Sequence, residues 1–210
     1  MKAIQKQKEP QSLIEHRTSS YADYNNYKEK DNLRESLVAD QGAICCYCLQ
    51  RIHPTEDGMK VEHWHCQTGY PAEQLDYGNL LGACLGGEGK PPQLQHCDTK
   101  KGDQYLARNP ATPAHSIEAF IAFLSDGSIE SSDQVLNGQL APVLNLNLLM
   151  LKRNRKAALD AFKDSLAGRG TLTKAQLARE RDVWLTRTDG RLKEYCQVVV
   201  YWLRKRIARA

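Results

Sequence analysis

Apolar residues recur at helical spacing near the start of the chain. Leu33 and Leu37 lie one turn apart behind Asp31, a residue type that caps helix N-termini, and Gly42 follows as a typical helix stop. This pattern predicts a short helix over residues 31–40. The polar stretch before it, with Lys, Gln, Ser, Tyr and Asn throughout, predicts an irregular arm.

The middle of the chain carries a different pattern. Residues 59–64 alternate between apolar and polar positions, which predicts a short strand. Residues 75–83 predict a loop that packs through its leucines, and the glycines and prolines of residues 86–92 predict a flexible insertion. A helix is expected to begin near Cys97 and to run through Leu106. Strand, loop and helix in this order are typical of a ββα metal finger.

The last hundred residues predict mainly helices. Asp126-Gly127 and Asn137-Gly138 are turn signals, and the first follows an apolar run, as in a hairpin. Apolar residues fit one helix face within residues 144–166. Two further helices are expected over residues 172–186 and 191–208.

Charge is distributed unevenly over a chain whose formal net charge is +4. Residues 151–210 contain 16 Lys and Arg against 6 Asp and Glu, a net of +10, whereas the first 150 residues have a net of −6. A basic C-terminal part predicts an anionic partner, with nucleic acid the leading candidate and a merely solvated helical surface the alternative. No apolar run approaches the roughly 20 residues that span a bilayer. The first six residues lack the apolar core of a secretory signal, so we expect a cytoplasmic protein with no membrane partner.

Four of the seven cysteines have the order of metal ligands. Cys45-x-x-Cys48 places two sulfurs about one tetrahedral edge apart, and Cys84 and Cys97 supply a second pair across the glycine-rich insertion. We expect the four thiolates to bind a structural zinc ion in a reducing cytosol. Buried or redox cysteines are the alternative, but a thioredoxin-like Cys-x-x-Cys needs a βαβ context, and here a short helix precedes it.

Side chains between these cysteines have the chemistry that phosphodiester hydrolysis needs. A base must take a proton from water, and a cation must stabilise the charge on the phosphate and the leaving oxygen. Glu62 and Asp98 are candidate ligands of magnesium or another divalent ion, which prefers carboxylate oxygens. His63 is the candidate base, and Asn79 would orient it. Because Glu62 and His63 are strand neighbours that point to opposite faces, a bend at the strand end must bring them together.

Other residues near these positions compete for a role or add one. His65 lies on the same strand face as His63 and is an alternative base or metal ligand. His96 borders a proposed zinc ligand and is an alternative ligand. We favour His63 because it directly follows a carboxylate. Lys100 and Lys101 lie one turn into the expected helix and are suited to contact nucleic-acid phosphates.

The order of these residues resembles the HNH endonuclease family, whose motif reads Cys-x-x-Cys, Asp-His, Asn-Leu and Cys-x-x-Cys-His-x-x-Lys. The matching residues are Cys45 and Cys48, Glu62-His63, Asn79-Leu80, Cys84, and Cys97-Asp98 followed by Lys100-Lys101. Asp98 stands where the family has its last histidine, and the gap between Cys84 and Cys97 is longer than usual. We therefore expect an α+β fold in three parts. They are an N-terminal arm and short helix over residues 1–42, a zinc-supported ββα-metal (HNH) core over residues 43–105 and a basic, mainly helical region over residues 106–210.

Further motifs narrow the resemblance to the HNH subunit of Septu-type anti-phage systems, the PtuB-like group, which includes retron-associated versions. These motifs are Met1-Lys2-x-Ile4, Cys45-x-Tyr47-Cys48, Val61-Glu62-His63, Asp76-Tyr77-x-Asn79-Leu80, His96-Cys97-Asp98-x-Lys100-Lys101-Gly102-Asp103, and Leu144-Asn145-Leu146-Asn147 with Arg153 and Arg155. The resemblance implies a partner ATPase of the ABC/SMC type (PtuA-like). In retron versions it also implies a reverse transcriptase and its RNA–DNA product.

We therefore expect a metal-dependent HNH endonuclease that hydrolyses phosphodiester bonds in DNA or RNA as the effector of a defence complex. Two rival functions belong to other classes. A non-catalytic zinc module that binds nucleic acid or protein would need the cysteines but not His63 or Asp98. A thiol redox protein would form a reversible disulfide between Cys45 and Cys48 and would bind no metal.

Overall fold

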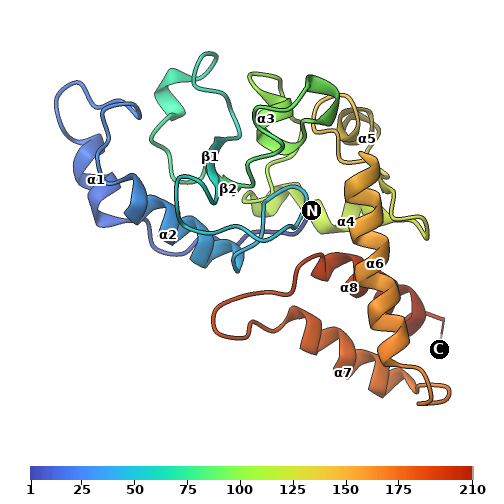
Figure 1. Ribbon diagram of the computed structural model, residues 1–210. Helices are drawn as coiled ribbons and strands as arrows, with labels where there is room; N and C mark the ends of the chain where they lie inside the picture. The colour runs from blue at the N-terminus through green and yellow to red at the C-terminus, as the bar shows by residue number, and fades with distance from the viewer. Residues whose placement is uncertain (210) are drawn as a thin grey trace.

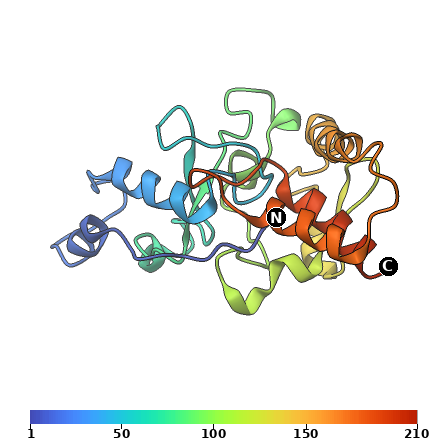
Figure 2. The same ribbon diagram turned by 90° about the horizontal axis from the view of Figure 1, so that it is seen from below.

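The computed structural model describes residues 1–209 and has a mixed α+β architecture with two small two-stranded sheets. In Figures 1 and 2, α1 and the C-terminal helices lie at opposite ends of the molecule, with the β1–β2 sheet between them. The helices and strands are α1 (Gln11–Arg17), α2 (Lys30–Gln41), β1 (Lys60–His63), β2 (Leu80–Ala83), α3 (Cys97–Lys101), α4 (Ile117–Phe120), β3 (Ile121–Phe123), β4 (Ile129–Ser131), α5 (Gln134–Leu140), α6 (Leu149–Ser165), α7 (Lys174–Leu185) and α8 (Cys196–Ile207).

The predicted N-terminal helix is confirmed as α2. Leu33 and Leu37 are buried on its inner face, and Gly42 ends it in the left-handed conformation with a φ of +64°. The helix begins one residue earlier than expected, with Glu29 rather than Asp31 at the N-cap and Asp31 in the first turn. The preceding arm is not wholly irregular, since α1 forms within it and buries Leu13.

The expected strand is confirmed as β1. The prediction of a loop over residues 75–83 is wrong for its last four residues. Residues 80–83 form β2, which pairs antiparallel with β1 so that Glu62 faces Leu81 and His63 faces Leu80. Every residue of β2 is buried, so it lacks the alternation by which half-buried strands are identified. The following helix, α3, is also shorter than expected and ends at Lys101.

The C-terminal predictions are confirmed in part. Helices α6, α7 and α8 correspond to the three predicted helices, although α6 and α8 each begin five residues late. The hairpin expected at Asp126-Gly127 joins β3 to β4. The prediction of a turn at Asn137-Gly138 is wrong, because these residues lie inside α5. The side chain of Asp133 caps the N-terminus of this helix.

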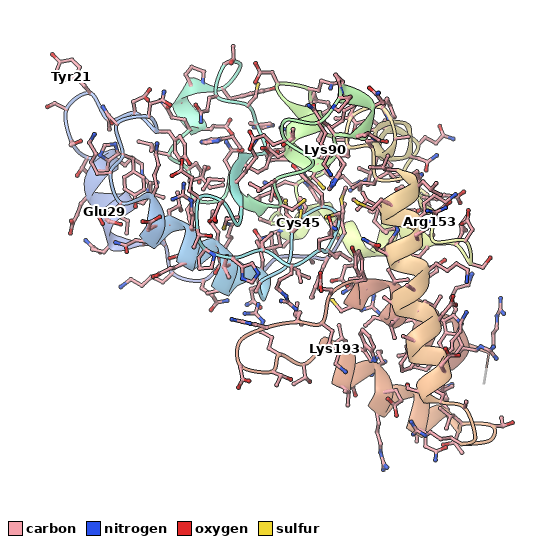
Figure 3. The ribbon with its side chains drawn as sticks, viewed as in Figure 1. Tyr21, Glu29, Cys45, Lys90, Arg153 and Lys193 are labelled. Atoms are coloured by element: carbon pink, nitrogen blue, oxygen red, sulfur yellow. The ribbon has the colours of Figure 1, made fainter. Side chains whose placement is uncertain are left out.

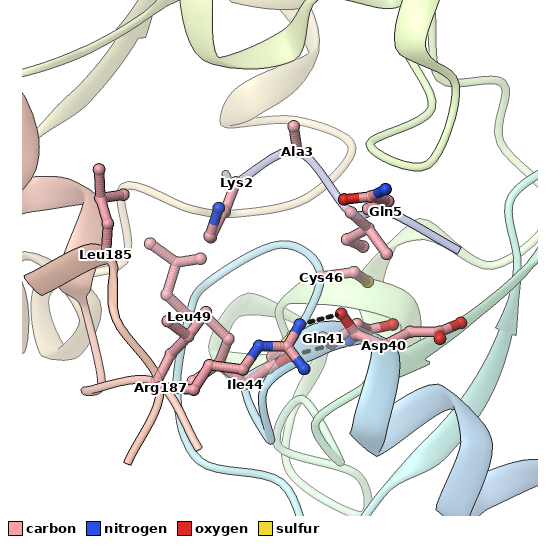
Figure 4. A pocket seen from close by; sticks show the side chains of 13 residues that line it. Lys2, Ala3, Gln5, Asp40, Gln41, Ile44, Cys46, Leu49, Leu185 and Arg187 are labelled. Carbon is pink, nitrogen blue, oxygen red and sulfur yellow. Dashed lines mark hydrogen bonds between the residues drawn. The ribbon is translucent and has the colours of Figure 1, made fainter. Parts of the chain in front are cut away.

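Two arginines connect the C-terminal region to the rest of the molecule. Arg187, in the loop after α7, donates hydrogen bonds to the backbone oxygens of Ala39 and Asp40 at the end of α2. Figure 4 shows Arg187 beside Asp40. Arg51 donates to the oxygen of Ala43 at 2.9 Å and to that of Leu192 at 2.7 Å. These bonds give charged donors to backbone carbonyls at the end of α2, in the turn after it and at Leu192.

The β3–β4 hairpin is held against α6 by a buried arginine. The guanidinium of Arg155 donates to the oxygens of Gly127 and Leu146, both at 2.6 Å. Gly127 has a φ of +84°, and a Cβ added there would lie 2.0 Å from the backbone oxygen of Lys152. Only glycine fits this approach of the hairpin to the helix.

Replacing Gly127 with alanine should therefore lower the free energy of unfolding by about 2–5 kcal/mol, through backbone strain and overpacking. Gly138→Ala is the matched control, because Gly138 lies in α5 with open space where a Cβ would stand. That change should be neutral or stabilise by up to about 1 kcal/mol. Chemical denaturation measures both variants, and a Gly127→Ala protein as stable as the parent would contradict this packing.

Candidate metal centre and carboxylate cleft

Four buried cysteine sulfurs meet at one point near the centre of the molecule, where Figure 3 labels Cys45. The sulfurs of Cys45, Cys48, Cys84 and Cys97 all lie within 4.8 Å of one another. Cys45 Sγ is 3.9 Å from Cys97 Sγ, and Cys48 Sγ is 3.6 Å from Cys84 Sγ. Sulfurs bound to zinc at about 2.3 Å in a tetrahedron lie about 3.8 Å apart. The four thiols are therefore placed to hold a metal ion such as zinc.

Three separate segments bring these sulfurs together. The first pair lies in a tight turn in which the Cys45 N–H donates to Gln50 O at 2.8 Å and Leu49 adopts a φ of +70°. Cys84 directly follows β2, and Cys97 is the first residue of α3. Cys97 has a φ of +55°, and its N–H donates to Leu144 O at 2.9 Å. The start of α3 is thus held by contacts to distant parts of the chain.

The chemistry of the four donors fits a divalent cation. Burial raises the pKa of Cys48 and of Cys97 well above the usual thiol value. Four thiols packed this closely gain negative charge only if a cation compensates it. His96, an alternative ligand, lies beside the group, with Nδ1 at 3.2 Å from Cys97 Sγ and 3.9 Å from Cys84 Sγ. It does not belong to the set of mutually close ligand atoms.

Glu62, His63 and Asp98 line one shallow cleft of about 210 Å³ beside this centre. Glu62 and His63 both line the cleft although they are neighbours in β1, of which His63 is the last residue. Asp98 belongs to the first turn of α3, directly after a cysteine of the metal centre. Its carboxyl group lies close enough to Glu62 to raise the pKa of that residue. The cleft also includes Cys66 and Asp103.

Glu62 is a deeply buried carboxyl group with three polar neighbours. Tyr47 donates its hydroxyl proton to Glu62 Oε1 at 2.7 Å, and the Lys101 ammonium lies 3.0 Å from the same oxygen. Burial raises the pKa of Glu62 well above its usual value, and the nearby Asp98 carboxyl raises it further, while Lys101 acts in the opposite direction. A cation placed between the two carboxyl groups would relieve this repulsion.

His63 is largely buried and packs edge-on against the Tyr24 ring, with centroids 4.5 Å apart. Burial lowers the pKa of His63 to about 4, so the ring is neutral at pH 7. Its Nε2 lies 3.1 Å from the backbone oxygen of Gln74, which accepts only if Nε2 carries the proton. Nδ1 then carries the lone pair, and the Gln67 amide nitrogen lies 3.1 Å from each of the two ring nitrogens.

Asn79 and His65 have structural partners outside the cleft. The Asn79 side chain accepts from the N–H of His65 at 2.7 Å and donates to the His65 oxygen at 3.0 Å, so it holds the segment that follows β1 rather than the backbone of His63. The His65 ring stacks between Trp64 and Tyr70, each at 4.0 Å, and its Nδ1 lies 2.7 Å from Glu73. His65 is therefore engaged in an aromatic stack and does not line the cleft.

The nucleic-acid contact predicted for Lys101 does not fit its position. Lys101 is 1% exposed, and its ammonium contacts Glu62 and the backbone oxygen of His63. A helix of only five residues turns this side chain inward, under the strand. Lys100 is half-buried and comes within 3.5 Å of Pro92 O, which leaves it nearer the surface.

Several residues of the site were not among the predicted functional residues. Tyr47 was noted only as part of the Cys-x-Tyr-Cys motif, and its hydroxyl binds Glu62. Gln67 and Tyr24 contact the His63 ring from loops that carry no recognisable motif. Only the position of Tyr47 inside the cysteine turn offered a signal in the sequence.

Comparisons with known proteins identify no relative. No protein-family model matches the chain, and no curated protein matches it. The coordinates show four buried cysteines that could hold a metal ion such as zinc, beside a cleft with two carboxyl groups and an imidazole. Among residues 1–209, no helix has the length and apolar character needed to cross a membrane.

Replacing Cys84 with serine should abolish stoichiometric zinc binding and lower the free energy of unfolding by about 4 kcal/mol or more, because metal binding contributes to folding. Cys66→Ser is the matched control, since Cys66 lies outside the cysteine group. It should keep one zinc per chain. Elemental analysis of the purified proteins measures the metal, and a zinc-free parent protein would contradict the assignment.

Replacing Lys101 with methionine should destabilise the protein by about 3 kcal/mol or more, because Glu62 loses its buried cationic partner. Adding Glu62→Gln should recover part of that loss. Lys100→Met, whose ammonium has no carboxylate within ion-pair distance among residues 1–209, should be close to neutral. Denaturant titration of the parent, Lys101→Met, Glu62→Gln and the double variant closes a double-mutant cycle that measures the coupling between the two buried groups. If the Lys101 side chain contacted nucleic-acid phosphates instead, its loss would leave the free energy of unfolding unchanged.

Proposed function

We propose that this chain is a metal-dependent HNH endonuclease that hydrolyses phosphodiester bonds in nucleic acid. The observation that supports this most is the meeting of Glu62, His63 and Asp98 in one cleft beside four clustered cysteines. The elements β1, β2 and α3 follow one another in the order of a ββα finger. The sequence resemblance to HNH nucleases rests on these same residues.

Glu62 and Asp98 are the proposed ligands of a catalytic divalent cation, magnesium or another. Tyr47 and Lys101 both contact Oε1 of Glu62, which leaves Oε2 for the cation. When bound, such an ion stabilises negative charge on the phosphate and on the leaving oxygen. Lys60 Nζ lies 3.7 Å from Asp98 Oδ2 and adds positive charge at the cleft. The four cysteines hold the structural zinc ion.

His63 is the proposed general base. Because its pKa is lowered to about 4, the ring is uncharged at neutral pH and can accept a proton. Nδ1 accepts the proton from water, while the Nε2–H bond to Gln74 O keeps the ring oriented. Gln67, which contacts Nδ1 in the free protein, would give way to the attacking water. Asn79 contributes by holding the loop after β1.

The partners in this proposal come from the family resemblance. They are a nucleic-acid substrate, an ABC/SMC-type ATPase (PtuA-like) and, in a retron version, a reverse transcriptase with its RNA–DNA product. The basic region over residues 151–210 supports an anionic partner. The chain would act in the cytoplasm as the effector of an anti-phage system.

Replacing His63 with alanine should lower the rate of nucleic-acid cleavage in magnesium or manganese by about 10²–10⁴-fold, because the general base is lost. Asp98→Asn should also abolish cleavage. His53→Ala, which changes an exposed histidine far from the cleft residues, is the control and should cut normally. Cleavage of labelled DNA and RNA measures the rates, and melting curves check the fold. Undiminished cleavage by a folded His63→Ala protein would exclude this mechanism.

The rival non-catalytic zinc module gives a different pattern. In that case His63→Ala and Asp98→Asn would keep nucleic-acid or protein binding, neither they nor the parent would cleave, and Cys48→Ala would abolish binding by unfolding the metal centre.

A further inference from the structure

A groove in the C-terminal region brings aromatic and cationic side chains together. It has a volume of about 340 Å³ and lies between α8, the second half of α6 and the β3–β4 turn. The side chains that matter here are Lys163, Tyr201, Trp202, Lys205, Arg206 and Arg209. In Figure 1, α8 lies well below β1 and α3, so this groove is separate from the carboxylate cleft.

The spacing along α8 places a cation on each aromatic ring. Residues four apart are neighbours on a helix surface. Lys205 follows Tyr201 by four residues, and its Nζ lies 5.4 Å from the ring centroid. Arg206 follows Trp202 in the same way, with Cζ 4.9 Å from that ring. Arg209 continues the first row by one further turn.

The two rings are held in position from their other sides. The Phe162 ring meets Trp202 at 78°, and the Phe123 ring meets Tyr201 at 72°, both with centroids 5.9 Å apart. Such edge-to-face contacts orient an aromatic ring without hiding both of its faces. Both rings remain partly exposed. The groove therefore presents preoriented flat surfaces.

Three of the four cations that line this groove have no carboxylate partner within the described part of the chain. Among residues 1–209, neither Lys205 nor Arg206 nor Arg209 has a carboxylate within ion-pair distance, and no carboxylate residue lines the groove. The adjacent Arg204 points elsewhere and pairs with Glu118 at 3.2 Å. Lys163 is 3.9 Å from Asp160, which is closer to Lys156.

We propose that this groove binds a segment of single-stranded nucleic acid, with bases stacked at Tyr201 and Trp202 and phosphates at Lys205, Arg206 and Arg209. Flat rings beside unpaired cations match the alternation of bases and phosphates in a single strand. An acidic protein segment would satisfy the cations but would leave the rings without a stacking partner. This inference rests on the proposed nuclease function only in that the bound strand is its substrate; the groove adds affinity, and the cleft performs the chemistry.

The test compares two double variants that remove the same charge from the C-terminal region. Lys205→Gln with Arg206→Gln alters the groove, whereas Lys174→Gln with Arg179→Gln alters exposed cations of α7. Fluorescence anisotropy measures binding of labelled oligouridylate and oligothymidylate of about 16 nucleotides, without added divalent cation. The groove variant should bind about 10-fold more weakly at low salt. The slope of log K against log salt should become shallower by about 1.4, because each phosphate contact on a single strand contributes about 0.7.

The stacking contact has its own readout. Either oligonucleotide should quench the tryptophan fluorescence of the parent protein. Trp202→Phe keeps a ring against Phe162 and should bind with similar affinity, but most of the quenching should disappear. Comparing the two oligonucleotides shows whether the groove prefers RNA or DNA.

Wild-type affinity and salt slope in the Lys205→Gln/Arg206→Gln protein would overturn the inference, as would a parent chain that binds neither oligonucleotide. The groove would then be left for an acidic protein partner. Binding that depends on these residues in a chain that never cleaves would instead contradict the proposed nuclease function and leave the groove assignment standing. If the chain does cleave, the groove variant should raise KM and leave kcat close to that of the parent.

Discussion

The convergence of four cysteine sulfurs is the constraint on which the proposed site depends. Cys45 and Cys48 lie in one turn, Cys84 follows β2, and Cys97 begins α3, so a single ion among them would join three segments. These segments are also linked by backbone hydrogen bonds, from Cys46 N–H to Gly82 O at 3.0 Å and from His96 N–H to Gly86 O at 2.8 Å. Asp98 is covalently next to Cys97, which means that the metal centre also decides where its carboxyl group lies. A helix of five residues has almost no stability of its own. Its position beside β1 comes from tertiary contacts: the cysteine cluster, the Cys97–Leu144 hydrogen bond, and the contacts of Lys101 with Glu62 and with His63 O.

The cysteine cluster also accounts for the closeness of the Glu62 and Asp98 carboxyl groups, an arrangement that costs free energy. The Asp98 carboxyl lies close enough to raise the pKa of Glu62, and the buried ammonium of Lys101 lies 3.0 Å from Glu62 Oε1. Burying such a group is unfavourable unless partners compensate it. Tyr47 and Lys101 provide part of that compensation, and a divalent cation would provide the rest. Perturbed ionisable groups of this kind are concentrated at functional sites, although structural ion pairs also produce them.

Much of this arrangement could be predicted from the sequence, and the exceptions have physical reasons. The four-cysteine cluster followed from order and spacing, since few other arrangements of soft ligands hold zinc. Strand β2 did not follow, because residues 80–83 are buried on both faces and show no alternation. The helix expected from residue 144 begins only at Leu149, because Leu144 and Leu146 are buried in an irregular segment in which Asn145 has a φ of +48°. Asn137-Gly138 is a strong local turn signal, but Asp133 caps a helix that runs through it.

The directions in which side chains point at the site were harder to predict from the sequence than the identity of the candidate metal ligands. The direction of the Lys101 side chain depends on where a short helix meets a strand, which no local sequence pattern encodes.

The central claim is that the cysteine cluster places Asp98 beside Glu62 so that the two carboxylates hold a second ion. Anomalous diffraction from crystals grown in manganese tests it most directly. The account predicts a zinc peak among the four cysteines and a separate manganese peak between Glu62 and Asp98. A zinc peak alone, with Lys101 as the only cation at Glu62 in saturating manganese, would contradict it.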